Sequence, residues 1–442
     1  MKLSEIINFN PIRKIAKGKE APFVEMAALP QHSRDIAYVF QKEFNGSGTK
    51  FKNGDTLLAR ITPCLENGKT TKVNCLKTSQ IGHGSTEFIV MEAKNPEYDE
   101  DFIYYLSRWN VFRDYAIARM EGSSGRQRVD WKALADFECK LPKKEIRKKN
   151  GYILKQLDDK ISINNKINIQ LEILAQTLFK SWFIDFEPVK AKIEAIQKGK
   201  DPQLTVMKLI SGKTSQEISQ MPLEQRKELA DTADLFPDEM KDDIPKGWKL
   251  LPLYETAEYI NGGAFKASDF SKGKEGLPII KIAELKSGIS DQTEFTIKEF
   301  PDKYHIHNDD MLYSWSGSPE TSLEVFKWFG GDGLLNQHIF KINTQSIEQK
   351  VFVYYLLKHL KPVLIETAKN KQTTGLGHVT VADMKRIKVV YPDKKAIKLI
   401  KLKLLSIFDM SSNCKKENVT LAEIRDTILP KLISGEIIEK LI

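Results

Sequence analysis

Three short stretches carry residue types that could do chemistry. GKTS at 212–215 resembles the end of a phosphate-binding loop, but Met207 stands where that loop needs its first glycine. His305 and His307 are spaced like two metal ligands on one face of a strand, yet no third ligand accompanies them. PDEMK at 237–241 places its carboxylates too close together for a nuclease motif. We therefore predict that the chain is not an enzyme by itself.

A second group of polar residues is suited to hydrogen bonding rather than to catalysis. Arginine can pair with guanine, and asparagine or glutamine with adenine, through two parallel hydrogen bonds. In the first half of the chain the candidates are Arg60, Thr62, Asn67, Lys69, His83, Ser85, Ser123, Ser124, Arg126, Gln127 and Arg128. In the second half they are Lys266, Ser314, Ser316, Ser318, Asn336, Gln337, His338, Lys371, Gln372, Thr373, Thr374 and His378. Each segment alone has the composition of an ordinary loop.

The excess of positive charge is concentrated at two places. Lysine and arginine number 68 against 59 acids, a formal charge of +9, which is compatible with a polyanionic partner. KKEIRKK at 143–149 contributes Lys143, Lys144 and Lys148, and DKKAIKLIKLK at 393–403 contributes Lys394 and Lys395. A solvated charged face explains either run. Cations at the start of a helix oppose its dipole, however, so their recurrence favours contacts to nucleic-acid phosphates.

These segments belong to an internal duplication. FIYYLSR at 102–108 returns as FVYYLLK at 352–358, and GRQRVDWKALADFECKLP at 125–142 returns as GLGHVTVADMKRIKVVYP at 375–392, both at an offset of 250. NGDTLLARI at 53–61 matches NDDMLYSWS at 308–316 at an offset of 255. The apolar framework is kept while the polar segments differ. That pattern is expected of two surfaces that read two different sequences.

Each copy is predicted to be a mixed α/β domain followed by a long helix. Apolar residues recur at heptad spacing after residue 143, and the repeat places Asn168 and Asn418 at one shared position of a helix seam. The alternative is that each helix packs only on its own domain. We predict domains at 1–142 and 248–392, long helices at 143–187 and 393–442, and between the copies a linker at 188–247 with one or two short helices.

Bulk properties narrow the class of protein. No apolar run approaches the roughly 20 residues of a membrane span, and the first residues lack the apolar stretch of a signal peptide. The four cysteines form no close pair, a pattern typical of a reduced compartment. We therefore expect a cytoplasmic protein without metal or cofactor of its own and without a membrane partner.

The order of these motifs resembles a known family. ILAQTLFKSWFIDFEPVKAK at 173–192, LFPDEM at 235–240, IPKGWKLLPLYETAEYINGGAFK at 244–266, LLNQHIFKI at 334–342 with its partner GHGSTEFIVM at 82–91, TTGLGHVTV at 373–381 and ILPKLISGEI at 428–437 follow one another along almost the whole chain. Together they are similar to the DNA specificity subunits of type I restriction-modification systems.

The resemblance implies an architecture and a set of partners. Two target-recognition domains would each read one half of a bipartite site in double-stranded DNA. The two long helices would pair as an antiparallel coiled coil and hold the half-sites about one helical turn apart. Two methyltransferase subunits would bring S-adenosylmethionine and methylate adenine after flipping it out of the stack, and two restriction subunits would use ATP and magnesium.

Two other functions stay open at this point. A free-standing adenine methyltransferase would need an Asn-Pro-Pro-Tyr motif, but NPEY at 95–98 has Glu97 in place of the second proline, and no glycine-rich cofactor loop precedes it. A protein-interaction scaffold with two docking domains on a coiled coil would bind no DNA. Its complexes would therefore lack the salt dependence that phosphate contacts impose on DNA binding.

Overall fold

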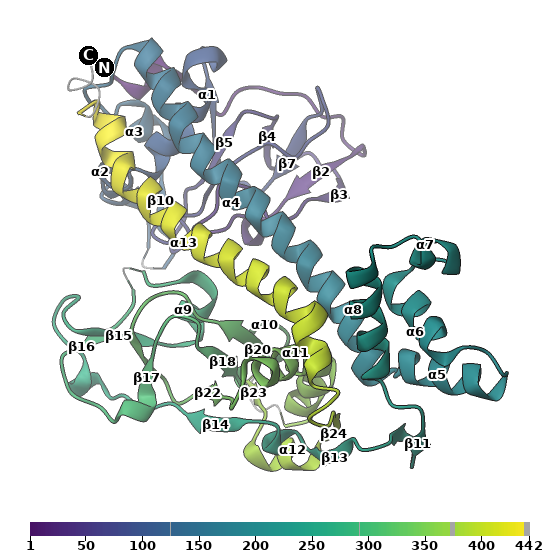
Figure 1. Cartoon of the computed structure of the whole chain (residues 1–442). Helices are drawn as coiled ribbons and strands as arrows, with labels where there is room; N and C mark the ends of the chain where they lie inside the picture. The colour runs from purple at the N-terminus through teal and green to yellow at the C-terminus, as the bar shows by residue number, and fades with distance from the viewer. Residues whose placement is uncertain (124, 291, 372–375, 437–442) are drawn as a thin grey trace. The chain divides into compact units, whose positions relative to one another are not determined.

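The computed structural model describes residues 1–123, 125–290, 292–371 and 376–436. The chain divides into two compact units (Figure 1). Unit 1 combines Met1–Asn164 with Glu417–Ile442, and unit 2 is Asn165–Lys416. Within the described residues, no helix is both long enough and apolar enough to cross a membrane.

Unit 1 contains two four-stranded sheets. The first has the order β1-β8-β5-β6 and is antiparallel throughout, and the second has the order β3-β2-β7-β4 with β2 and β7 parallel. The strands of the two sheets are β1 Ile7–Phe9, β2 Glu20–Val24, β3 Phe40–Glu43, β4 Thr49–Phe51, β5 Thr56–Ala59, β6 Thr70–Lys72, β7 Gly82–Gly84 and β8 Phe88–Ala93. The remaining short elements are η1 Leu3–Glu5, η2 Met26–Ala28, α1 Pro96–Arg108, α2 Asn110–Ile117, β9 Met120–Glu121, β10 Arg128–Val129 and α3 Trp131–Ala135.

Unit 2 repeats this topology strand for strand. Its sheets have the orders β14-β22-β18-β20 and β16-β15-β21-β17, and its parallel pair of β15 with β21 corresponds to β2 with β7. The strands are β14 Glu258–Asn261, β15 Leu277–Ile280, β16 Phe295–Thr296, β17 His305–Ile306, β18 Met311–Ser314, β20 Glu324–Lys327, β21 Gly333–Leu335 and β22 Ile339–Asn343. The duplication predicted from the sequence is thus a duplication of fold, and the mixed α/β class is confirmed.

Unit 2 also contains shorter pairs and helices. The two-stranded pairs are β11 Met240–Lys241 with β12 Ile244–Pro245, β13 Lys249–Pro252 with β24 Lys388–Tyr391, and β19 Ser316–Gly317 with β23 Gly377–His378. The helices are η4 Leu253–Glu255, η5 Ala267–Asp269, α9 Ile282–Ser287, η6 Asp302–Tyr304, α10 Pro319–Ser322, α11 Ile347–Lys369 and α12 Val381–Arg386.

The repeated phrase FIYYLSR forms the core helix of its unit. In α1 the run from Phe102 to Leu106 is almost completely buried, and in α11 the run from Phe352 to Leu356 is equally buried. Both helices therefore face apolar neighbours on more than one side, which explains why the phrase is apolar at consecutive positions rather than only at every third or fourth. The phrase recurs because the same packing problem is solved twice.

The two long helices run antiparallel where they meet in unit 1. They are α4, Lys144–Phe179, continued by the π-helical turn η3, Lys180–Ile184, and α13, Leu405–Ser434, preceded by the π-helical turn η7, Ile400–Leu404. Asn150 Nδ2 donates to the Leu432 carbonyl at 2.6 Å, whereas Asn164 Nδ2, further along α4, donates to Asn418 Oδ1 at 2.9 Å. Rising numbers on one helix therefore meet falling numbers on the other. The expected antiparallel coiled coil is confirmed.

The asparagine seam differs from the prediction. The sequence repeat makes Asn168 and Asn418 equivalent, but the residue that faces Asn418 in unit 1 is Asn164. In an antiparallel pair, the register between the two helices decides which residues face each other. The offset between the sequence copies does not, so equivalent residues such as Asn168 and Asn418 need not meet. Asn168 lies in unit 2, where its buried Oδ1 has no hydrogen-bond partner among the described residues.

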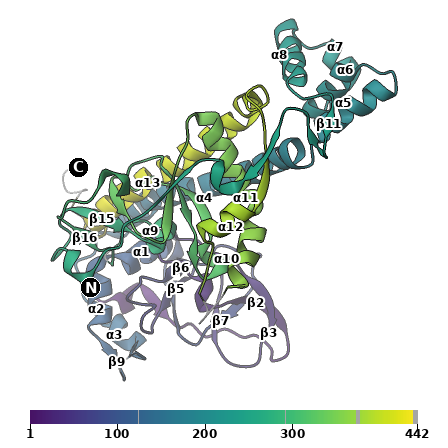
Figure 2. The same cartoon turned by 90° about the horizontal axis from the view of Figure 1, so that it is seen from below.

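The segment at 188–247 is more ordered than the sequence predicts. It holds four helices instead of one or two, namely α5 Glu187–Gln197, α6 Pro202–Ser211, α7 Ser215–Ser219 and α8 Leu223–Asp234, which gather beside one another (Figure 2). Pro188 and Pro202 lie in the first turn of α5 and α6, and Pro222 is the N-cap of α8, so these prolines begin helices rather than break them.

Two lysines fasten the end of α8 to the rest of unit 2. Lys192 Nζ donates to the carbonyls of Ala233 and Phe236 at 3.2 and 2.8 Å, and Lys395 Nζ donates to the Asp234 carbonyl at 3.0 Å. A positive charge at a helix C-terminus also interacts favourably with the helix dipole. The segment is therefore a folded part of unit 2 rather than a tether.

Candidate nucleic-acid interface

Three loop segments meet in unit 1 where β5 ends. The Arg60 amide donates to the Glu87 carbonyl, the Val129 amide donates to the Arg60 carbonyl, and the Thr62 amide donates to the Gln127 carbonyl, each at 3.0 Å. We call the surface formed by residues 60–62, 85–87 and 126–128 the first reading surface. Of the residues singled out in the sequence, it brings together Arg60, Thr62, Ser85, Arg126, Gln127 and Arg128.

Arg60 and Arg128 are both half-buried in this surface, but they differ in their partners. Arg128 lies against Glu87, with its Nε 2.9 Å from both carboxylate oxygens and its Nη2 2.7 Å from Oε1. The hydrogen bonds that Arg128 donates to Glu87 raise the pKa of Arg128. Arg60 Nε, by contrast, is buried and has no hydrogen-bond partner among the described residues. The positive charge of Arg128 is thus largely balanced within the protein, and that of Arg60 is not.

Several predicted contacts in unit 1 have structural roles instead. His83 is only 3% exposed, donates one hydrogen bond from Nε2 to the Lys42 carbonyl and packs between Phe23 and Phe44. The prediction that it contacts bases is therefore wrong for this structure, because the two aromatic rings cover the imidazole and the Lys42 carbonyl takes its hydrogen bond. Lys69 Nζ donates to the Met26 carbonyl at 2.9 Å. Asn67 lies in the same loop, Ser123 is exposed at the β9–β10 turn, and Ser124 lies outside the described residues.

Unit 2 builds a corresponding surface where β18 ends. The Trp315 amide donates to the His338 carbonyl at 3.3 Å, the Val379 amide donates to the Trp315 carbonyl at 2.9 Å, and Ser316 pairs with His378 in the β19–β23 ladder. We call residues 315–317, 336–338 and 377–378 the second reading surface. It brings together the predicted residues Ser316, Asn336, Gln337, His338 and His378.

Other predicted residues of unit 2 lie beside or beneath this surface. Ser314 is completely buried in β18, so the prediction that it contacts bases is wrong for this structure. Lys371 forms an ion pair with Asp383 at 2.6 Å; burial opposes the charge of Asp383, but Lys371 and Thr380 outweigh it and hold the pKa of Asp383 at about 2. Lys266 and Ser318 are exposed next to the surface, and Gln372, Thr373 and Thr374 lie outside the described residues.

The basic run at the start of α4 has protein partners. Arg147 is buried against Asp99, with Nε 2.5 Å from Oδ1, and Lys148 Nζ lies 2.9 Å from Glu97 Oε1. Lys144 Nζ lies 4.9 Å from the centre of the Tyr98 ring. These contacts join α4 to α1. They explain why cations stand at the N-terminus of α4, where the helix dipole disfavours positive charge. Lys143 and Lys394 are exposed, and Lys395 holds the end of α8.

Sequence reasoning missed two residues of the reading surfaces. Trp315 is partly exposed at the centre of the second surface, and the alignment of NGDTLLARI with NDDMLYSWS already placed it opposite Arg60. Glu87 is the acid that holds Arg128, 41 residues away in the sequence. No local pattern signals that pair, because it depends on how two hairpins converge.

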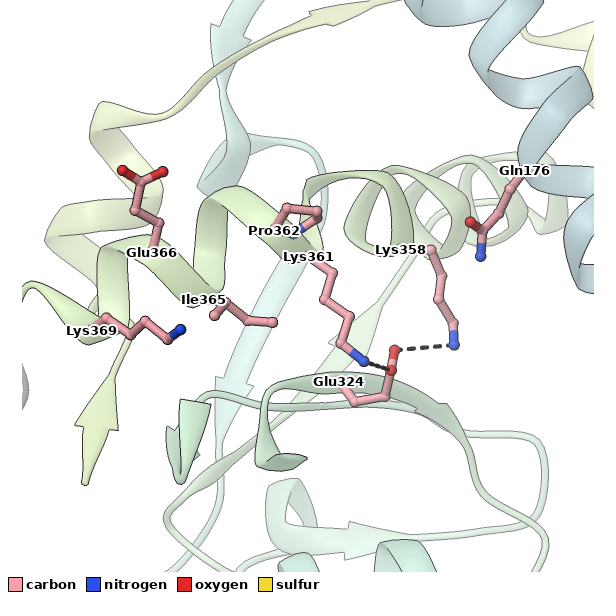
Figure 3. Close-up of a pocket in the computed structure, with 8 residues that line it drawn as sticks. All are labelled: Gln176, Glu324, Lys358, Lys361, Pro362, Ile365, Glu366 and Lys369. Atoms are coloured by element: carbon pink, nitrogen blue, oxygen red, sulfur yellow. Dashed lines mark hydrogen bonds and ion pairs between the residues drawn. The ribbon is translucent and has the colours of Figure 1, made fainter. Parts of the chain in front are cut away.

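A pocket of about 580 Å³ lies beside α11, and one acid and two lysines that line it form ion pairs with each other (Figure 3). Glu324 on β20 forms ion pairs with Lys358, at 3.0 Å, and with Lys361. Burial opposes the charge of Glu324, but the two lysines outweigh it and lower the pKa of Glu324. These groups brace α11 against the sheet. Among the described residues, no cluster of three or more His, Cys, Asp or Glu side chains could hold a metal ion.

Comparison with known proteins identifies the family. The family of type I restriction modification DNA specificity domains matches residues 1–173 and 245–422. The chain is 29% identical over 421 residues to the type I restriction enzyme HindI specificity subunit of Haemophilus influenzae, covering 90% of this chain and 89% of the relative. It is 23% identical to the MjaIX specificity subunit of Methanocaldococcus jannaschii, covering 76% and 69%.

A solved structure is similar along nearly the whole length. It is the type I restriction-modification S subunit from M. genitalium, with 15% identity, coverage of 98% of this chain and 95% of that chain, and a TM-score of 0.48. The two stretches matched by the family together span most of the chain, and each contains one of the two reading surfaces. The chain therefore belongs to the family of type I restriction modification DNA specificity domains.

Proposed function

We propose that the chain is the DNA-reading subunit of a type I restriction-modification complex and that each reading surface recognises one half of a bipartite site. The observation that carries the proposal is a single backbone arrangement built twice with different side chains. Trp315 in unit 2 has the backbone partners that Arg60 has in unit 1. A repeated frame with exchanged side chains suits the recognition of two unlike half-sites.

We further propose that the chemistry belongs to partner subunits. Two methyltransferase subunits would bring S-adenosylmethionine and methylate a flipped adenine, and two restriction subunits would use ATP and magnesium, all in the cytoplasm beside the chromosome. Exposed aliphatic side chains on α4 within unit 2 support such partners: Ile169 and Ile173 lie on one face of the helix, and Ile167 and Leu174 lie on another. A group of exposed aliphatic side chains is typical of a surface that a partner covers.

The salt dependence of binding to duplex DNA tests this function against a scaffold without DNA. Phosphate contacts release counterions, so the affinity of the full-length chain for duplex DNA should fall at least tenfold between 50 and 200 mM salt. The measurement is a fluorescence titration of labelled duplex at several salt concentrations. Binding that is absent, or that does not change with salt, would instead support the scaffold.

A further inference from the structure

The two reading surfaces correspond position by position. Arg60 and Trp315 each donate their amide to the turn before the next strand, at Glu87 and His338, and each accepts from a valine, at Val129 and Val379. The next residues, Ile61 and Ser316, pair with Arg128 and His378 in equivalent bridges. The same backbone frame therefore presents Arg60, Glu87 and Arg128 in unit 1 and Trp315, His338 and His378 in unit 2.

In unit 1 the frame carries one arginine, Arg60, whose guanidinium is available to a ligand. Glu87 engages Arg128 through both Nε and Nη2, and Arg128 Nη1 donates to the Arg126 carbonyl at 3.1 Å. Arg60 has no such acid, and its buried Nε has no partner among the described residues. An unpaired guanidinium at a DNA-reading surface is suited to the two acceptors of guanine, O6 and N7.

In unit 2 the frame carries a fixed aromatic group instead. The Trp315 ring lies 5.7 Å from the rings of both His338 and Phe340, measured between centres. Its only polar atom, Nε1, donates to Asn261 Oδ1 at 3.2 Å. The part of the Trp315 side chain that remains available to a ligand is therefore apolar. The only apolar group on the major-groove edge of a base pair is the methyl group of thymine.

We propose that Arg60 reads a guanine in the half-site of unit 1 and that Trp315, at the equivalent position, reads the methyl group of a thymine in the half-site of unit 2. This inference rests on the proposed function and adds the base chemistry of each half-site to it. The two half-sites then differ at one corresponding base pair, G·C in one and A·T in the other, because one residue of the repeated frame is exchanged.

Base analogues that change one group at a time provide the test. In the target duplex, 7-deazaguanine removes the N7 acceptor and uracil removes the thymine methyl group. With the full-length chain, 7-deazaguanine in one half-site should weaken binding by about 5- to 150-fold, the range of a bidentate arginine–guanine pair. Uracil in the other half-site should weaken it by about fourfold, the effect of one methyl group returned to water.

Variants assign each effect to its residue. In Arg60→Ala the 7-deazaguanine effect should disappear while the uracil effect stays, and in Trp315→Ala the reverse should hold. Arg60→Lys keeps the charge but loses the paired donors, and Trp315→Phe keeps an apolar ring. Both variants disturb the fold less than the alanine variants do. Arg226→Ala, on the exposed face of α8, is the matched control and should leave both effects intact.

The outcomes separate the inference from the function on which it rests. Sequence-specific binding with analogue effects that persist unchanged in Arg60→Ala and Trp315→Ala would overturn the inference and leave the function standing. Insensitivity to uracil combined with loss of binding in Trp315→Ala would also overturn it, because that combination is expected of a wedge between base pairs. No sequence-specific binding of the unmodified duplex would overturn both.

Discussion

Replacing Asp158 by alanine is expected to lower the free energy of unfolding of the helix pair in unit 1 by about 3 kcal/mol, because it leaves a buried charge without its buried partner. Asp158 and Arg425 are 5% and 4% exposed, and Asp158 Oδ1 lies 2.6 Å from Arg425 Nη1. The second carboxylate oxygen accepts from the Tyr105 hydroxyl at 2.7 Å. One carboxylate thus joins α4, α13 and the core helix α1.

Hydrogen exchange of the backbone amides of α4 between residues 150 and 164 measures this change within unit 1. Asp426 provides the matched control, since it contacts the same guanidinium from a side chain that is 61% exposed. Asp426→Ala should change protection by less than about 1 kcal/mol. The double variant Asp158→Leu with Arg425→Met should recover most of the loss, because apolar residues can replace a buried pair. Equal effects of the Asp158 and Asp426 variants would contradict this account.

Lys327→Met is expected to remove a large pH dependence from the stability of unit 2. Lys327 ends β20 in a buried position, and its Nζ donates to the Phe408 carbonyl and the Ser411 and Ser412 hydroxyls at 3.1, 3.2 and 2.9 Å. No carboxylate forms an ion pair with it among the described residues, although Glu172 and Asp309 act on it from a distance. Burial, reinforced by the charges of Lys415 and Lys358, lowers the pKa of Lys327 to about 7.

The direction of the pH effect follows from where the proton is bound. Between pH 7 and the ordinary lysine pKa of 10.5, the unfolded chain holds a proton on Lys327 that the folded chain has lost, so stability rises with pH. Between pH 7 and 9.5 this contributes on the order of 3 kcal/mol. Amide exchange of β20 and α11 in the unaltered chain should therefore slow relative to Lys327→Met as the pH rises. Parallel pH profiles for the two proteins would refute the assignment.

The sequence predicts the framework of this fold better than its contacts. The offset of 250 between FIYYLSR and FVYYLLK, and the apolar spacing after residue 143, depend on packing rules that act along one helix. They anticipate the duplication and α4. The pairing of Asn164 with Asn418 depends on the register between two helices, and the four helices at 187–234 depend on prolines that begin helices as well as end them.

The same holds for the reading surfaces: the sequence predicts which segments form them better than it predicts the contacts within them. Loop composition alone points to residues 60–62, 126–128, 316 and 336–338, which the structure brings together in two groups. Loop composition cannot distinguish an exposed donor from one that the fold buries, as it buries His83 and Ser314. Nor can loop composition show that Glu87 pairs with Arg128 and leaves Arg60 without a partner among the described residues. Both distinctions depend on tertiary contacts between segments far apart in the sequence.

The most direct test of the proposed function is a map of modified bases across the host genome, read by long-read sequencing with and without the gene for this chain. Deletion should abolish adenine methylation at one bipartite motif and leave other motifs unchanged, and the lost motif would reveal both half-sites at once. An unchanged map in cells where the partner methyltransferase is expressed and active would contradict the account.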